Sequence, residues 1–166
     1  MQNIIEQTLQ YNASLVEITG GEPLLQKETS ELAKALLDKG LTVLIETNGS
    51  MDITILPSGC HRIIDLKTPS SNECGKNDFS NLDVINKKDE IKFVLSDRND
   101  YEWAKKIISE YNITNQCEVL FSPVYGYIEC KKIAEWILMD NLKVRLQPQL
   151  HKILWPHDFK ESDIHE

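Results

Sequence analysis

The sequence has no closely spaced cysteines and no long apolar run. Its four cysteines are Cys60, Cys74, Cys117 and Cys130, and no two of them form a CxxC or CxxxC pair. A disulfide framework and a self-contained zinc or iron–sulfur site are therefore not expected. No segment approaches the about 18 consecutive apolar residues that a membrane-spanning helix needs. The sequence thus predicts neither a membrane protein nor a cysteine-stabilised fold.

Basic residues are also fewer than acidic residues. There are 18 Lys and Arg residues against 26 Asp and Glu residues, which gives a formal net charge of -8. Nucleic acids and anionic membranes bind to cationic surfaces, so neither is expected as a partner. The first residues lack the charged and apolar regions of a signal peptide, which predicts a cytoplasmic protein. With 166 residues, of which 41% are hydrophobic, the chain can form one domain with a sizeable core.

Apolar runs rich in Val, Ile and Leu alternate along the chain with segments of helical periodicity. The interval between the first two runs has the length of one βαβ unit. This pattern predicts an α/β fold with a mostly parallel sheet covered by helices. The chain has too few βα units for an eight-stranded barrel, so an open or partial barrel is expected. The expected strands are residues 15–19, 41–47, 61–67, 90–95, 118–121 and 143–146, and the expected helices are 3–13, 26–39, 100–111 and 129–139. Thr29 or Ser30 is expected to cap helix 26–39, and Asp97 or Asn99 is expected to cap helix 100–111.

Two further segments define the domain organisation. Residues 69–88 are rich in Asn, Ser and Lys, and a loop of that length inside a domain is usually functional or mobile. Residues 157–166 are charged and follow the last expected strand, so they are predicted to form a loose tail. The predicted domain therefore comprises residues 1–156.

The segment Thr19-Gly20-Gly21-Glu22-Pro23 ends the first expected strand. Two consecutive glycines allow positive φ angles and let the backbone approach a ligand without a Cβ in the way. Glu22 can then receive a cationic group, and Pro23 fixes φ for the turn into the next segment. A purely structural strand-to-helix turn explains the same residues equally well.

Polar residues also follow nearly all of the remaining expected strands. The carboxyl ends of parallel strands meet at one edge of a sheet, where ligands bind in such folds. These residues are therefore expected to line one binding cleft. The strand ends in question are 19–22, 46–49, 65–67, 122–123 and 147–149, and His151 follows the last of them.

The segment from Thr19 to Pro23, together with Glu46-Thr47-Asn48-Gly49, resembles the radical S-adenosylmethionine (SAM) enzymes. That resemblance implies a partial (β/α)6 barrel in which the Gly-Gly-Glu turn holds the amino group of SAM. Three further segments restrict the resemblance to one family of these enzymes. They are residues 65–71 (DLKTPSS), 89–98 (DEIKFVLSDR) and 144–152 (VRLQPQLHK). Together the five segments resemble the 7-carboxy-7-deazaguanine synthases of queuosine and deazapurine biosynthesis.

The resemblance implies a lyase that converts 6-carboxytetrahydropterin to 7-carboxy-7-deazaguanine, with SAM, a [4Fe-4S] cluster and Mg²⁺ as cofactors. It also implies that the pterin is the small-molecule partner, and it is compatible with a homodimer. By position, it assigns Thr19, Gln149 and His151 to the substrate. The residues that it assigns to SAM are Gly20, Gly21, Glu22, Asn48, Asp65, Lys67, Ser122 and Pro123.

The chain departs from the family in one respect. The family carries a CxxxCxxC cluster loop after its first strand, followed by a threonine that binds Mg²⁺, and neither occurs here. We therefore expect a chain truncated at its amino terminus, lacking the first βα unit and inactive as given, with no metal ligands of its own. Two alternatives remain: a glycyl-radical activating enzyme of the same superfamily, or a cluster-less module that binds SAM or a nucleotide.

Overall fold

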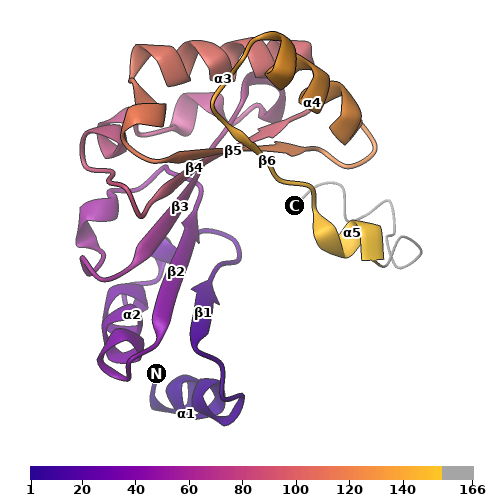
Figure 1. Ribbon diagram of the computed structural model, residues 1–166. Helices are drawn as coiled ribbons and strands as arrows, with labels where there is room; N and C mark the ends of the chain where they lie inside the picture. Colours follow the sequence, from indigo (N-terminus) through magenta and orange to yellow (C-terminus); the bar gives the residue numbers. More distant parts are fainter. Residues whose placement is uncertain (155–166) are drawn as a thin grey trace.

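The computed structural model describes residues 1–154, which form a six-stranded sheet flanked by helices (Figure 1). The tail predicted at residues 157–166 lies outside the described part of the chain. The strands are β1 (Leu15–Ile18), β2 (Thr42–Thr47), β3 (His61–Leu66), β4 (Glu90–Leu95), β5 (Glu118–Pro123) and β6 (Arg145–Leu146). The helices are α1 (Gln2–Gln10), α2 (Thr29–Asp38), α3 (Arg98–Glu110), α4 (Cys130–Met139) and α5 (Leu150–Leu154).

The strands lie side by side in chain order, from β1 to β6, and all their pairings are parallel. The α/β fold with a mostly parallel sheet is therefore confirmed. In Figure 1, α1 and α2 lie at the β1 end of the sheet and α3 and α4 lie at the β4 to β6 end. All six expected strands form, and the short α5 after β6 was not predicted. Among residues 1–154, no helix is long and apolar enough to cross a membrane.

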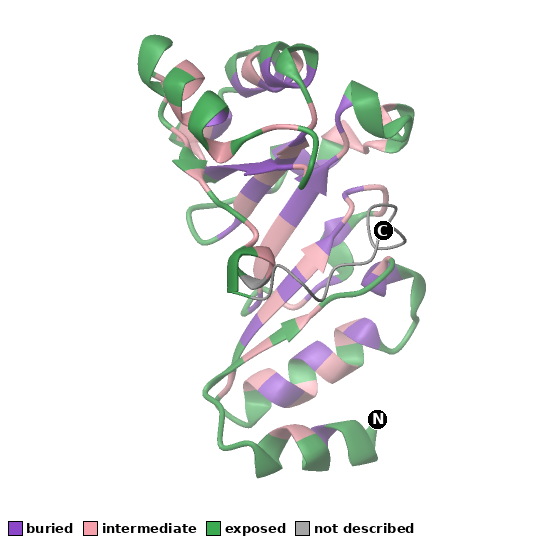
Figure 2. Cartoon of the chain, turned by 90° about the vertical axis from the view of Figure 1, so that its right-hand side faces the viewer, coloured by how far each residue is buried: buried purple, intermediate pink, exposed green. Residues whose placement is uncertain are grey.

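The two faces of the sheet differ in chemistry because successive side chains of a strand point to opposite sides. Figure 2 shows the resulting alternation of buried and less buried residues along the strands. One face packs against α2, α3 and α4 and is apolar; its buried residues are Val43, Ile45, Ile64, Ile91, Phe93, Leu95, Val119 and Phe121. The opposite face, called the polar face below, carries Glu17, Glu46, Asp65, Lys92 and Ser122.

The starts of α3 and α2 are held by different kinds of side-chain hydrogen bond. Asp97 caps α3 by accepting a hydrogen bond from the backbone N–H of Asp100 at 3.0 Å, as the sequence pattern indicates. The expectation that Thr29 or Ser30 caps α2 is wrong, because Glu28 precedes the helix and gives no side-chain cap. The Thr29 hydroxyl instead donates to the carbonyl of Pro23 at 2.6 Å. This bond ties the start of α2 to the turn that follows β1.

The polar segment 69–88 is held in place by its own amide side chains. It contains three 3-10 turns, Pro69–Ser71, Cys74–Lys76 and Phe79–Asp83. Asn77 exchanges two hydrogen bonds, each of 2.9 Å, with the backbone of Lys67. Asn81 is 2% exposed and bonds three backbone groups of the loop after β2. Because buried amides need partners, these asparagines fix the segment against the carboxyl ends of β2 and β3.

Candidate functional site

The Gly-Gly turn after β1 adopts a conformation that favours glycine. Gly20 has φ +98° and Gly21 has φ +53°, both in the range that L-residues with a Cβ rarely adopt. A Cβ built on either residue would meet no atom within 4 Å. The glycines are therefore required by the backbone angles and not by crowding. The space beside the turn is open to a ligand.

Glu22 connects this turn to the end of β2. Its carboxylate accepts hydrogen bonds from the backbone N–H of Leu24 at 2.9 Å, from the Thr47 hydroxyl at 2.8 Å and from the backbone N–H of Asn48 at 2.7 Å. Two of these donors lie 25 and 26 residues further along the chain, so the sequence alone did not indicate them. The structure thus brings together Glu22 and Asn48, two of the residues assigned to SAM by resemblance. The half-buried carboxylate is fixed in one orientation.

Asp65 and Lys67 lie on the polar face at the end of β3. Asp65 is 8% exposed, and one of its oxygens, Oδ2, accepts from the Lys67 ammonium at 2.9 Å. The other oxygen, Oδ1, is buried and has no hydrogen-bond partner among the described residues. An unpaired buried carboxylate oxygen is costly, so this oxygen is available to a hydrogen-bond donor from a ligand or from water.

A third part of the predicted site lies at the carboxyl ends of β5 and β6. The Ser122 hydroxyl donates to the carbonyl of Gln147 at 2.6 Å and joins the two strand ends. Pro123 and Gln149 line a cavity of about 570 Å³, which a ligand of moderate size can occupy. The Gln149 Oε1 atom is buried without a partner in the described part of the chain. The side chain of His151, predicted to contact substrate, lies outside the described residues.

Two charged residues of the polar face, Glu17 and Lys92, were not among the predicted site residues, and both lie near Glu46 of the predicted strand end 46–49. The Lys92 ammonium contacts Glu46 Oε1 at 2.6 Å, and both side chains are partly buried. Burial disfavours the charged form of Lys92, but the hydrogen bond to Glu46 and the charges of Asp65, Glu46 and Glu17 outweigh it and raise its pKa. Burial and the neighbouring Glu46 raise the pKa of Glu17. A charged residue inside an otherwise apolar strand, as in Leu15–Ile18, is the signal that could have identified these positions.

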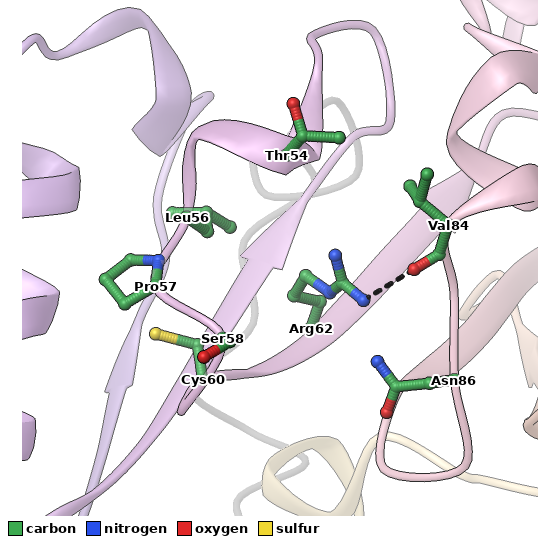
Figure 3. A pocket seen from close by; sticks show the side chains of 8 residues that line it. All are labelled: Thr54, Leu56, Pro57, Ser58, Cys60, Arg62, Val84 and Asn86. Atoms are coloured by element: carbon green, nitrogen blue, oxygen red, sulfur yellow. Dashed lines mark hydrogen bonds between the residues drawn. The ribbon is translucent and has the colours of Figure 1, made fainter.

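A smaller cavity, of about 280 Å³, lies beside the start of β3 (Figure 3). Within it the Arg62 side chain donates to the carbonyl of Val84 at 3.0 Å. Arg62 also pairs with Asp89, which is 1% exposed. The charge of Arg62 is therefore already compensated. This cavity lies at the amino-terminal end of the sheet, and its pairing is structural.

The described residues do not fit a [4Fe-4S] cluster. A cluster of this type needs several cysteine thiolates converging on one point. No group of three or more His, Cys, Asp or Glu side chains in residues 1–154 could hold a metal ion. Cys60 and Cys117 are buried, whereas Cys74 and Cys130 are partly exposed. Because the four cysteines are dispersed over the fold, we interpret them as structural residues and not as cluster ligands.

Thiol labelling should report this arrangement. Burial raises the pKa of the Cys117 thiol to about 12 and also raises the pKa values of Cys60 and Cys74, but only Cys60 and Cys117 are buried away from a reagent. At neutral pH and under native conditions, an aromatic disulfide reagent should therefore modify only Cys74 and Cys130. All four cysteines should react in denaturant, which serves as the control. Rapid native modification of Cys117, located by peptide mass spectrometry, would contradict the buried placement.

Comparison with solved structures identifies the fold. SuiB from Streptococcus suis, in its S-adenosylmethionine-bound structure, matches with a TM-score of 0.62 and 16% sequence identity. The match covers 98% of this chain and 46% of SuiB, so the chain spans less than half of that structure. At this identity the likeness concerns the fold alone. It supports the partial radical-SAM-type barrel expected from the sequence, which is confirmed.

Comparison with curated proteins identifies the family. No family model matches the sequence. The 7-carboxy-7-deazaguanine synthase of Chlorobaculum tepidum is 40% identical over 161 residues, which cover 95% of this chain and 73% of that protein. The enzyme of the same name from Koribacter versatilis is 39% identical, with 88% and 71% coverage, and that from Methanospirillum hungatei is 42% identical, with 82% and 57% coverage. The chain belongs to the 7-carboxy-7-deazaguanine synthase family.

Proposed function

We propose that this chain forms the SAM- and pterin-binding face of a radical SAM synthase that converts 6-carboxytetrahydropterin to 7-carboxy-7-deazaguanine. The observation that carries the proposal is the turn after β1. There Gly20 and Gly21 leave the backbone open, and Glu22 is bonded to Asn48 of the neighbouring strand end. Identity of 40% to a named synthase over 161 residues supports the same function.

In this proposal, the SAM site extends along the carboxyl ends of the strands. Gly20, Gly21 and Glu22 hold the amino group of SAM, because a carboxylate forms charge-assisted hydrogen bonds with an ammonium. Asn48 closes this end of the site. The remaining SAM contacts come from Asp65, Lys67, Ser122 and Pro123, all of which lie at strand ends.

The pterin is assigned to the residues beside this site. Thr19 directly precedes the glycines and directly follows Ile18, the last residue of β1, which is paired with Ile45 of β2. Gln149 lines the cavity at the ends of β5 and β6 and has a buried oxygen that can accept from a ring N–H. His151 completes the assignment by its position in the sequence.

Radical chemistry of this family needs electrons from an iron–sulfur cluster, and the described residues offer no three converging thiolates. We therefore infer that the 166-residue chain alone binds SAM without converting the pterin. This leaves one second candidate, a module that binds SAM as its only activity. No observation favours a glycyl-radical activating enzyme. The homodimer stays a prediction.

Isothermal titration of the purified chain with SAM tests the proposal. Saturable binding is expected for the wild type. Gly20→Val should abolish it, because valine does not adopt φ +98° without strain. Gly75→Val is the matched control, since Gly75 has ordinary backbone angles and open space around it, and it should bind SAM normally.

Anaerobic incubation with SAM, the pterin and a low-potential reductant tests the inference that the chain alone does not convert the pterin. No 7-carboxy-7-deazaguanine is expected by mass spectrometry. Failure of the wild type to bind SAM would contradict both the synthase and the binding-module readings. Product formation would contradict the inference that the four cysteines hold no cluster.

A further inference from the structure

The proposed SAM site uses the carboxyl ends of two neighbouring strands, β2 and β3. The pairing of β2 with β3 extends as far as Thr47 and Ile64. The pairing of β3 with β4 extends as far as Leu66 and Phe93. Lys67 lies beyond both registers, so no residue of a neighbouring strand is paired with it. Backbone groups at such a position need partners from another element.

Asn77, from the polar segment 69–88, supplies these partners. Its Oδ1 atom accepts from the backbone N–H of Lys67 and its Nδ2 atom donates to the carbonyl of Lys67, each at 2.9 Å. A side-chain amide carries the same donor and acceptor as a peptide group. Asn77 thus takes the place of a neighbouring strand residue beside Lys67.

The residues that follow Asn77 bind the end of β2. The backbone N–H of Asp78 donates to the carbonyl of Gly49 at 2.9 Å. The buried Asn81 side chain donates to the carbonyls of Gly49 and Met51 at 3.3 and 2.9 Å. The short stretch 77–81 is therefore bonded to the ends of both strands and links them beyond the last paired residues.

Lys67 transmits this anchoring to Asp65. Its ammonium binds Asp65 Oδ2 at 2.9 Å, while the Oδ1 atom of the same carboxylate is buried and has no partner among the described residues. Asp65 is 8% exposed. The unpaired oxygen is a second observation, independent of Asn77, that this end of β3 can receive a donor from a ligand. Where Asp65 stands depends on the backbone that Asn77 holds.

We propose that Asn77 is a positioning residue of the SAM site: by bonding both backbone groups of Lys67, it holds the end of β3 in a fixed place relative to the end of β2, so that one SAM molecule contacts both. The inference rests on the proposed function, which assigns Asn48, Asp65 and Lys67 to SAM. Without these two bonds the end of β3 populates other positions. The apparent dissociation constant then rises as the binding-competent fraction falls.

Amide hydrogen exchange followed by NMR tests the arrangement without any ligand. Exchange of the Lys67 N–H should be faster in Asn77→Ala than in the wild type, and it should stay slow in Asn77→Asp, whose carboxylate still accepts from that N–H. Asn86→Ala is the matched control: Asn86 belongs to the same polar segment, is exposed and accepts only from the nearby Lys88 N–H at 3.2 Å. Unchanged Lys67 exchange in Asn77→Ala would overturn the inference.

Calorimetric titration with SAM tests the consequence for binding. At neutral pH, Asn77→Ala should bind about tenfold more weakly than the wild type, which is the loss expected if about a tenth of the molecules keep the end of β3 in place. Asn86→Ala should bind as the wild type does. Equal affinities of Asn77→Ala and the wild type would overturn the inference and leave the proposed function standing.

Asn77→Asp supplies a measurement that a merely structural role would not change, and it decides the question if Asn77→Ala fails to fold. The ionised carboxylate accepts from the Lys67 N–H but cannot donate to the Lys67 carbonyl, whereas the protonated acid does both. The SAM affinity of this variant, relative to the wild type at the same pH, should therefore recover as the pH is lowered. The wild-type reference accounts for titration of Glu22 and Asp65. A relative affinity that does not change with pH would overturn the inference.

Failure of the wild type to bind SAM would instead overturn the proposed function and the SAM-linked part of the inference. The exchange of the Lys67 N–H needs no ligand, so it separates the two cases. Faster exchange in Asn77→Ala would then leave Asn77 as the residue that holds the end of β3, with SAM excluded as its ligand.

Discussion

SAM affinity is expected to fall at least about tenfold, or about 1.4 kcal/mol, when Glu22 is replaced by glutamine. The ligand ammonium loses a charge-assisted partner. The substitution also disturbs the turn, since the Glu22 carboxylate accepts from Leu24, Thr47 and Asn48 and a glutamine amide offers only one acceptor oxygen to these three donors. The measurement is the dissociation constant from calorimetry. An unchanged constant would remove Glu22 from the site.

Thr47→Val separates the charge of Glu22 from its orientation. Thr47 is 1% exposed and donates its hydroxyl to Glu22, so the variant removes one bond that orients the carboxylate while retaining the charge. Its affinity for SAM should stay closer to the wild-type value than that of Glu22→Gln. Equal losses in the two variants would mean that the turn geometry, and not the charge, determines SAM binding.

Asp89→Ala is expected to lower the free energy of unfolding by about 3–5 kcal/mol, because it leaves Arg62 as an unpaired buried charge. Asp89 accepts from the Arg62 backbone N–H at 3.2 Å, from its Nε at 3.0 Å and from its Nη2, and also from the backbone of Asn86 at 2.8 Å. The Arg62 and Asp89 side chains are 12% and 0% exposed. Such a loss is a large part of the stability of a typical domain. Urea denaturation followed by circular dichroism measures it.

Two controls identify the cause of that loss. Asp38→Ala breaks the Lys34–Asp38 pair on α2, whose side chains are 66% and 64% exposed, and should cost only about 0.3–0.5 kcal/mol. The double variant Arg62→Met with Asp89→Leu removes both buried charges and should recover much of the stability. A loss in Asp89→Ala no larger than that in Asp38→Ala would contradict the buried pair.

The sequence predicted the fold well because the signals for it are local. Val43 and Ile45 alternate with less buried residues along β2, and this alternation is a property of five or six consecutive residues. Asp97, one of the two residues predicted to cap α3, could be anticipated for the same reason, since its partner lies three residues away. The cap of α2 was predicted wrongly because the Thr29 hydroxyl bonds to Pro23, outside the helix, and the choice between these partners depends on tertiary packing.

Prediction of the site was less complete. Positive φ at Gly20 and Gly21 could be expected, since consecutive glycines at a strand end favour it. Glu17 and Lys92 were not predicted, because they lie inside strands, whereas ligand-binding residues of parallel sheets are expected at the strand ends. The sequence also left open how the long segment 69–88 is arranged, and in the structure Asn81 holds part of it by bonds to residues about 30 positions away.

By itself, the sequence determined the order of the strands and helices, the glycine turn after β1, the resemblance to the family and the lack of closely spaced cysteines. Each of these is encoded in neighbouring residues. Only the tertiary structure decided that Glu22 bonds Thr47 and Asn48, that Asp65 keeps an unpaired oxygen and that Lys92 joins Glu46 across β3. These contacts depend on strand register and on which face each side chain occupies, and both are set by packing between segments far apart in the chain.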